Sequence, residues 1–584
     1  MSMLTYNYHN DKSKSMKSKP KQVITIVSNA TVAKLDNAPK DVQLFVAKEL
    51  SYTMSGFDRS TLGKKQGWDG KKSFFSFKTQ TFPAGFARAV VAKLTKEGHR
   101  VNWVTRPLPE PRGPARPIVD TFGYSDERYH YQLETADKLV RFGRMVANVA
   151  TGGGKSRIAR ICYKRIARNT LFLTTRGVLM YQMRDNFEEL LGEKVGVVGD
   201  GHWTPTSGFN VGMVQTLAGN LEVKTLDNEV ERAVELEEDA LARKIEAYKR
   251  KLTRAKKSPI EVMTLVKAHR EELLKARISD EELVERIKKS IEKHNKRREE
   301  TLKFLRSVEF LILEEAHEAG SNEYYNVCMA CKNAYYRLAL TGTAFKRADE
   351  ESNMRLMAVS GPVGITVSEK KLIDLGVLAT PYFEYIKLPK ADKLFKSTSW
   401  ARAYELGVTG SEYRNRKIIE KCEMMKQYGL TSMVLVLRKE HGKSLKLMMK
   451  KRGLRVSFID GDASQAERKA ALQKLAANDI DVLIGTTILD VGVDVPSVGA
   501  IILGGGGKAE IALRQRIGRG LRAKKPPMPN VCFVFDFHDR YNDHLTKHGA
   551  ARRRIVMETP GFVENIVETI NPAEYGFIEV NKTC

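Results

Sequence analysis

The sequence predicts an α/β protein with two tandem parallel-sheet lobes, a small α+β N-terminal domain ahead of them, and a helical coiled-coil insertion in the first lobe. From residue 129 onward, apolar runs alternate with amphipathic helices, the pattern of a parallel sheet covered on both faces. Two separate series of runs occur, and each predicts one lobe. We place the lobes at 129–370 and 371–545, before a C-terminal extension at 546–584. The expected strands are 145–150, 170–175, 210–216, 310–313 and 337–343, then 432–437, 456–460, 482–487, 500–505 and 531–537.

The N-terminal part divides into three segments. Residues 1–20 form a polar, lysine- and serine-rich tail that we expect to be disordered. Residues 21–105 predict a compact domain. Residues 106–128 begin with five prolines in twelve positions, a composition typical of a stiff linker. The elements expected in the compact domain are a strand at 22–27 and helices at 39–50 and 84–97.

Residues 222–305 interrupt the first lobe with a stretch rich in Glu, Lys, Arg, Leu and Ala. Their apolar residues keep to one helical face, as in a coiled coil. Capping patterns at Ser258 and Ser279 mark helix starts. The charged face is explained equally well by solvation or by contact with a partner. The predicted arm has three antiparallel helices at about 227–256, 259–277 and 280–306.

The composition favours a polyanionic partner and a reducing compartment. Lysine and arginine outnumber the carboxylates by 98 to 70, which gives a formal charge of +28. No run of 18 apolar residues or apolar signal segment occurs, so no membrane span is expected. Six scattered cysteines do not form a disulfide framework, and a cytoplasmic location fits best.

The sequence VATGGGKS, residues 149–156, predicts a phosphate-binding loop between a strand and a helix. Its turn, Thr151 with Gly152, Gly153 and Gly154, would present backbone N–H groups to phosphates. Lys155 would reach the β- and γ-phosphates of ATP, and Ser156 would bind Mg²⁺. Val149 stands where the general pattern has its first glycine.

The sequence FLILEEAHEAG, residues 310–320, carries two adjacent carboxylates out of an apolar strand. A phosphate-loop enzyme needs one carboxylate for Mg²⁺ and a second that orients or deprotonates the attacking water. We assign Glu314 to the metal and Glu315 to the base. His317 is expected to link the nucleotide to the moving parts.

The sequence RQRIGRGLR, residues 514–522, predicts a helix that presents arginines on one face. An arginine that stays charged can stabilise the γ-phosphate as it is transferred. Arg519 and Arg522 are the candidates, supported by Gln515. A helix that only binds solvent or phosphate remains the alternative.

Taken in order, these motifs resemble those of superfamily 2 DNA helicases of the DEAD/DEAH-like kind, over about residues 129–540. The resemblance implies two RecA-like lobes that clamp ATP and couple its hydrolysis to movement on DNA. It also implies adenine-side residues at Tyr131 and Gln132, coupling residues at Thr341 and Thr343, and nucleotide contacts from Gly492 and Asp494. The DNA contacts that it implies are Thr174, Arg176, Gln215, Thr216, Thr486 and Thr487.

A narrower resemblance is to the T4-type phage family of branch-migration and strand-annealing helicases. It depends on GWDG (67–70) and FPAGFARAVVAKL (82–94), which are similar to that family's small DNA-binding domain. Trp68, Lys71 and Lys72 would contact DNA there, although nearby phenylalanines fit a hydrophobic core equally well. A phage-encoded chain would act in the host cytoplasm.

The implied function is an ATP- and Mg²⁺-dependent helicase on branched DNA in recombination, repair and replication, with little sequence preference. One alternative is a duplex translocase that does not separate strands. Another is a DNA-binding protein with a weakened ATP site, because the family has aspartate where this chain has Glu314. The arm at 222–305 has no counterpart in the family pattern, and we expect it to be dispensable for ATP hydrolysis.

Overall fold

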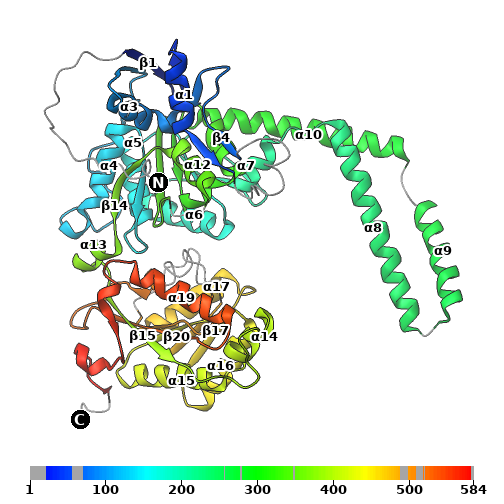
Figure 1. The fold of residues 1–584 in the computed structure, drawn as a ribbon, viewed down its shortest axis with the longest axis vertical. Helices are drawn as coiled ribbons and strands as arrows, with labels where there is room; N and C mark the ends of the chain where they lie inside the picture. Colours follow the sequence, from blue (N-terminus) through cyan, green and yellow to red (C-terminus); the bar gives the residue numbers. More distant parts are fainter. Residues whose placement is uncertain are drawn as a thin grey trace.

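The computed structural model describes residues 22–54, 70–255, 257–275, 279–345, 349–486, 498–507, 517–518 and 520–580. Figure 1 shows an N-terminal domain on the first lobe, the second lobe below it, and a helical arm that projects from the first lobe. Within these residues no helix is long and apolar enough to cross a membrane. The predicted tail and several predicted site residues lie outside the described residues: Trp68, Thr487, Gly492, Asp494, Gln515 and Arg519.

The first lobe is built on an eight-stranded sheet in the order β10-β9-β11-β8-β12-β13-β7-β14. All of its neighbours are parallel except β10 and β9. All five predicted strands are present. The strands are β7 (Arg144–Val149), β8 (Thr170–Thr174), β9 (Gly196–Gly199), β10 (His202–Thr204), β11 (Phe209–Met213), β12 (Phe310–Leu313), β13 (Tyr336–Thr341) and β14 (Val363–Val367).

Helices cover both faces of this sheet. Alternate residues of β12 enter two different clusters, Phe310 and Ile312 on one face and Leu311 and Leu313 on the other. Burial of both faces explains why such strands read as unbroken apolar runs. The helices are α4 (His130–Phe142), α5 (Lys155–Ile166), α6 (Gly177–Leu191), α7 (Val214–Leu221), α11 (Asn322–Ala330), α12 (Glu350–Ser360) and α13 (Glu369–Asp374).

The second lobe has a seven-stranded parallel sheet in the order β17-β18-β16-β19-β20-β15-β21. The two-lobe α/β class is therefore confirmed. β21 comes from the predicted C-terminal extension, which belongs in part to this sheet. The strands are β15 (Thr380–Lys387), β16 (Ser432–Leu435), β17 (Val456–Ile459), β18 (Val482–Gly485), β19 (Ala500–Ile502), β20 (Val531–His538) and β21 (Ile566–Val567), and the helices are α14 (Trp400–Tyr404), α15 (Glu412–Gln427), α16 (Lys439–Lys451), α17 (Gln465–Ala476) and α19 (Asp543–Met557).

The N-terminal domain packs directly on α12 of the first lobe. Met354, Met357 and Ala358 join the core of that domain. A side chain at Gly85 would lie 2.1 Å from the carbonyl oxygen of Met357, so glycine permits this close approach. The domain and the lobe therefore share one hydrophobic core. The domain contains β1 (Val23–Ser28), β2 (Val32–Asp36), α1 (Lys40–Glu49), β3 (Ser51–Thr53), β4 (Lys71–Ser73), β5 (Thr81–Pro83), α3 (Ala87–Lys96) and β6 (Arg100–Thr105).

The proline-rich segment lies along the first lobe and is not a free spacer. The Gly113 N–H donates to Arg165 O at 3.0 Å, and the Tyr336 hydroxyl donates to Pro109 O at 2.6 Å. Proline predicts an extended backbone correctly, but it says nothing about the surface on which that backbone lies.

The arm consists of α8 (Leu226–Arg254), α9 (Pro259–Lys275) and α10 (Asp280–Ser307), in agreement with the three predicted helices. α8 and α9 lie side by side away from the lobes (Figure 1), and the rings of Tyr248 and His269 are in contact, with centroids 4.2 Å apart and a tilt of 36° between their planes. The base of the arm is different, because Phe304 and Leu305 are buried in the first lobe. An excision that reaches residue 305 would therefore remove part of the lobe core.

Candidate active site

The carboxyl ends of three adjacent strands, β12, β13 and β7, gather the predicted nucleotide residues. Glu314 follows β12, Thr341 ends β13, and the glycine-rich turn follows β7. Ligands of open α/β sheets bind at this edge, where loops leave the strands. The order of the strands thus brings residues 160 positions apart in the chain into one site.

The glycine-rich turn has the geometry of a phosphate cradle. Gly152 has φ +87° and Gly154 has φ +77°, both in the left-handed region that favours glycine. α5 begins at Lys155, so the positive end of that helix faces the turn. The Lys155 Nζ lies 3.5 Å from Val149 O, within the loop that it is expected to serve.

Tyr131 and Gln132 hydrogen-bond to the backbone of this turn. The Tyr131 hydroxyl donates to Gly153 O at 2.7 Å, and Gln132 Nε2 donates to the same oxygen at 3.3 Å. Both side chains are buried. Both side chains thus contact the loop backbone, and the adenine contact expected of them stays a prediction.

A partly buried ion pair behind the turn was not predicted from the sequence. Arg157 Nε lies 2.7 Å from Asp120 Oδ2, and its Nη1 donates to Gln132 Oε1 at 2.6 Å. Asp120 belongs to the predicted linker. Its pairing with Arg157 holds its pKa below the usual range, against the opposing effect of burial. The linker thus fixes the first turn of α5.

Glu314 is a buried carboxylate with an unsatisfied oxygen. Its Oε2 has no hydrogen-bond partner among the described residues. Burial and the neighbouring Glu315 raise its pKa to about 8, while Lys155 acts in the opposite direction. A buried charge without a partner is costly, so this site favours either a proton or a cation.

The donor set fits Mg²⁺. Mg²⁺ prefers oxygen ligands and is usually held by one or two protein groups together with substrate phosphates and water. The orphaned oxygen of Glu314 supplies a carboxylate ligand, and Ser156 follows Lys155 at the start of α5. A nearby cation would restore the ordinary ionised state of Glu314.

Glu315 and His317 connect this carboxylate to β13. Glu315 has φ +43°, a left-handed conformation that is strained for a residue with a side chain. His317 Nδ1 lies 3.4 Å from Glu315 Oε2 and 3.4 Å from Thr341 Oγ1. Thr341 Oγ1 also accepts from the Thr343 N–H at 3.1 Å. The predicted base and the predicted coupling residues are therefore in contact.

The second lobe approaches the glycine-rich turn at Gly518. A side chain on Gly518 would lie 2.7 Å from Thr151 Cβ. The Ala379 N–H donates to Leu521 O at 2.6 Å, so Leu521 is fixed beside the connection between the lobes. Arg522 is exposed, and its backbone forms a β-bridge with Leu378.

The residues expected to contact DNA gather at the neighbouring ends of β8 and β11. Gln215 Nε2 donates to Thr175 O at 3.0 Å, and Arg176 Nη2 lies 3.4 Å from Glu318 Oε1. The Thr174 side chain is buried, and its Oγ1 accepts from the Arg176 N–H at 3.4 Å. Its contact with DNA stays a prediction, and Thr175 carries the neighbouring hydroxyl. Thr216 is half-buried in α7, and Thr486 is buried at the end of β18.

The lysines predicted to contact DNA in the N-terminal domain are exposed, whereas the neighbouring aromatic residues differ in burial. Lys71 and Lys72 lie on β4. Phe75 is buried in the domain core, and Phe74 packs on Tyr52 and Phe86. Phe77 is 52% exposed. The core interpretation is confirmed for the first two phenylalanines.

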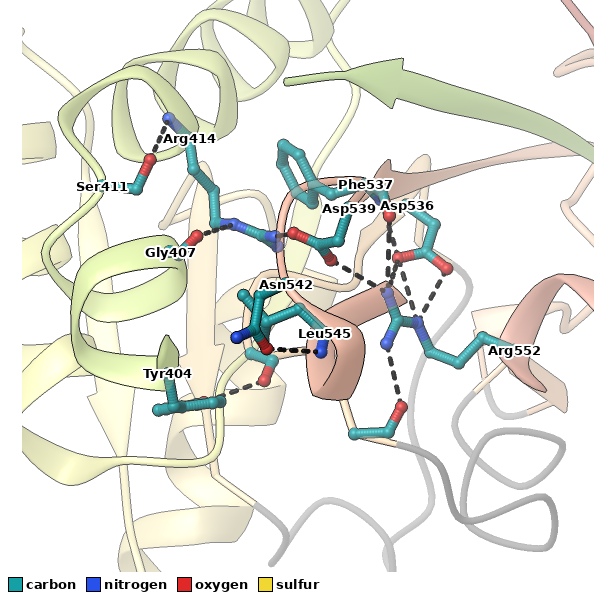
Figure 2. Close-up of polar contacts among 12 residues, drawn as sticks. Tyr404, Gly407, Ser411, Arg414, Asp536, Phe537, Asp539, Asn542, Leu545 and Arg552 are labelled. Atoms are coloured by element: carbon teal, nitrogen blue, oxygen red, sulfur yellow. Dashed lines mark hydrogen bonds and ion pairs between the residues drawn. The ribbon is translucent and has the colours of Figure 1, made fainter. Parts of the chain in front are cut away.

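A buried polar cluster in the second lobe contacts Gly505 and Gly507, which follow β19 (Figure 2). Arg552 Nε lies 2.9 Å from Asp536 Oδ2, and Arg552 Nη1 donates to Gly507 O at 2.9 Å. Arg414, which is fully buried, pairs with Asp539. No motif in the sequence pointed to these residues, because Arg414 and Arg552 lie in ordinary charged helices.

Two family models match the chain. "Type III restriction enzyme, res subunit" matches residues 126–346, and "Helicase conserved C-terminal domain" matches residues 415–524. The first match covers the glycine-rich turn, the acidic loop and Thr341. The second covers most of the strands of the second lobe and the segment at 517–522.

Curated relatives match over part of the chain. "Putative helicase 22" of Sulfolobus islandicus filamentous virus is 26% identical over 251 residues, which are 41% of this chain and 43% of that protein. "Putative ATP-dependent helicase IRC3" of Saccharomyces cerevisiae is 27% identical over 243 residues, 40% of this chain and 34% of that protein. The matched part is less than half of either relative.

Two solved structures that match the chain have low sequence identity to it. T4 UvsW is 15% identical, with 94% of this chain and 99% of that chain covered and a TM-score of 0.39. The helicase MrfA, solved with DNA and AMPPNP, is 12% identical, with 81% of this chain and 60% of that chain covered and a TM-score of 0.47.

Proposed function

We propose that this chain, which belongs to helicase superfamily 2, is an ATP-dependent DNA helicase or translocase that acts on forks and Holliday junctions. The observation that carries the proposal is the contact of Gly518 in the second lobe with Thr151 in the glycine-rich turn of the first. A nucleotide bound at this turn would lie between the two lobes. Binding and hydrolysis would then change how the lobes meet.

In the proposed cycle, Lys155 and the amides of the turn hold the ATP phosphates. Glu315 orients the attacking water, and Arg519 and Arg522 stabilise the transferred phosphoryl group from the second lobe. Mg²⁺, held by Ser156 and Glu314, would neutralise charge on the phosphates. His317 would pass the change at Glu315 to Thr341, which it contacts.

DNA is the proposed substrate because the polar groups at the ends of β8 and β11 suit a phosphate backbone. Arg176 and Gln215 are exposed there, and the chain carries a formal charge of +28. Backbone contacts carry no base information, so binding should be sequence-independent and salt-sensitive. The preference for branched DNA is the narrower proposal, since it depends on the resemblance of residues 67–94 to phage branch-migration helicases.

One experiment tests both the proposed ATP site and the proposed action on branched DNA. The wild type and Lys155→Ala are compared for ATPase activity with and without DNA, and for ATP-dependent processing of forks, Holliday junctions and complementary single strands. Lys155→Ala should lose DNA-stimulated hydrolysis while DNA binding remains. Retained hydrolysis in that variant would contradict the ATP site. Hydrolysis without resolution of any branched substrate would contradict branch migration alone.

A second candidate is a duplex translocase that does not separate strands. It is favoured by the match of residues 126–346 to the restriction-enzyme model. Such a motor hydrolyses ATP on plain duplex and displaces a bound obstacle, but leaves a four-way junction intact. Triplex displacement measured beside junction resolution separates the two candidates.

The arm is proposed to select a substrate or a protein partner. α8 and α9 lie away from the nucleotide site, and Ile260 and Met263 are 80% and 78% exposed. Deletion of residues 230–290, which keeps the buried base of α10, should leave ATP hydrolysis intact and change binding. Loss of folding in this shortened deletion would contradict the independence of the arm.

A further inference from the structure

A cavity separate from the nucleotide site lies at the seam between the N-terminal domain and the first lobe. It has a volume of about 510 Å³ and is lined by Arg88, Arg141, Phe142 and Arg144, among others. A smaller cavity of about 250 Å³ adjoins it and shares these four residues. We call the two together the seam pocket. Its volume lies within the range of small-molecule sites, ~300–1,000 Å³.

The seam pocket is strongly basic. Lys138 lines the larger cavity together with the three arginines, and Arg106 lines the smaller one. The larger cavity has one carboxylate in its lining, Asp137, which pairs with Arg165. The smaller cavity has no carboxylate in its lining. Lys138 pairs with Glu134 at 2.8 Å, so the positive charge that faces this space comes from the arginines.

Two of these arginines each donate a hydrogen bond to the other side of the seam. Arg88, from the N-terminal domain, donates to Phe142 O at 3.2 Å and lies 4.5 Å over the Phe142 ring. Arg144, from β7, donates to Ala30 O at 2.7 Å. Burial together with the positive charges of Arg337 and Arg88 lowers the pKa of Arg144 to about 9. A bound anion would relieve this repulsion.

The seam pocket is separate from the nucleotide site. Arg144 begins β7, whereas the glycine-rich turn follows Val149 at its other end. A strand of this length spans roughly 20 Å, at ~3.3 Å per residue. The two sites thus lie at opposite edges of one sheet and cannot share a ligand.

We propose that the seam pocket binds a small phosphate-bearing molecule, of the size of pyrophosphate or a nucleotide, and that this ligand fastens the N-terminal domain to the first lobe. Guanidinium groups bind phosphate oxygens in pairs, which suits arginines that meet from two sides. The concave, small volume favours such a molecule over the broad surface of a DNA duplex. Binding to the folded protein alone would also stabilise it.

The test is calorimetric titration of inorganic pyrophosphate into the full chain, without Mg²⁺ and at moderate salt. Lys155→Ala is the background, because it weakens binding at the glycine-rich turn. Pyrophosphate should bind this background and raise its Tm. Adding Arg141→Gln should weaken binding about tenfold through the loss of one charge-assisted contact. Arg141 is exposed, so this variant should fold.

Arg416→Gln in the same background is the matched control. Arg416 is an exposed arginine on α15 of the second lobe, so the change in net charge is the same. It should leave pyrophosphate binding unchanged. Equal binding in the Arg141 and Arg416 variants would overturn the proposal, as would no binding in the background at millimolar pyrophosphate. If Arg141→Gln weakens binding of a short duplex but not of pyrophosphate, the pocket serves DNA and the proposal is also wrong.

Discussion

Both lobes bury carboxylates at the carboxyl edge of a parallel sheet, but the polar partners of these carboxylates differ between the lobes. In the second lobe, Asp536 is 4% exposed and pairs with Arg552, while Asp539 pairs with Arg414 (Figure 2). In the first lobe, Glu314 is 9% exposed, and its Oε2 has no hydrogen-bond partner in the part of the chain that the structure describes. The difference separates a structural carboxylate from one that is held ready for a ligand.

The physical reason is the cost of burying charge. A buried carboxylate that pairs with a well-placed arginine replaces its hydrogen bonds to water with hydrogen bonds to the arginine. Removing the carboxylate is destabilising, because it leaves the charge of the buried arginine uncompensated. A buried carboxylate without a partner lowers stability in the free protein and is retained where function needs it. The two lobes therefore predict opposite outcomes for the same kind of substitution.

The largest expected effect is that of Glu314→Gln on activity. We expect ATP hydrolysis to fall by at least ~100-fold, because the proposed metal ligand and its charge are removed. The fold should be retained, since no buried partner is left behind. Steady-state ATPase activity and thermal unfolding measured on one preparation check both points. Normal turnover would remove Glu314 from the site.

The second effect is that of Asp536→Asn on stability. It removes the nearest counter-charge of the buried Arg552, which keeps its longer contact with Asp539 at 3.9 Å, and should cost up to about 3–5 kcal/mol in the free energy of unfolding of the second lobe. Urea unfolding followed by tryptophan fluorescence measures it. The double change Asp536→Leu with Arg552→Met removes both charges and should recover part of the loss. No recovery would mean that the pair is not the source of the cost.

The third effect is a pH dependence confined to the first lobe. The pKa of Glu314 rises from 4.5 to about 8 on folding, so the folded state holds an extra proton between these values. Stability from this group is fully present below pH 4.5 and is lost as the pH rises toward 8. The Tm of Mg²⁺-free wild type should fall by a few degrees relative to Glu314→Gln between pH 5 and pH 8. Parallel curves would contradict the raised pKa.

The smallest effect is that of Glu314→Asp, which introduces the family's usual residue. The shorter stem withdraws the carboxylate from a site built around glutamate, and we expect about tenfold slower hydrolysis. The Mg²⁺ dependence of the ATPase rate should shift to higher concentrations. A faster rate would instead support the hypothesis of a weakened ATP site.

Local motifs point to candidate nucleotide residues because each motif occupies a short stretch of chain, and the structure places these residues at adjacent strand ends. The turn at Gly152–Gly154 and the acidic pair at Glu314 need only a strand end beside them, and apolar runs identify strands. The same reasoning did not predict that the Thr174 side chain is buried, since a motif does not say whether Thr174 or Thr175 faces outward at the end of β8. Only the packing around the last turn of the strand decides that.

Long-range packing was beyond the sequence. Asp120 lies in a proline-rich stretch, and nothing in that stretch indicates its pairing with Arg157. The docking of the N-terminal domain depends on Met354 and Met357, whose apolar side chains are equally suited to the core of their own lobe. The cluster around Arg552 likewise joins residues from distant helices and strands.

The arm has a consequence for synthesis on the ribosome. β12, which carries Glu314 at its end, pairs with β8, and the whole arm lies between them in the chain. At ~5–20 residues per second, the 82 residues from Leu226 to Ser307 delay the emergence of β12 by roughly 4–16 seconds. During that interval β8 has one side of its backbone open, and the nascent lobe is exposed to misassociation until its central strand arrives.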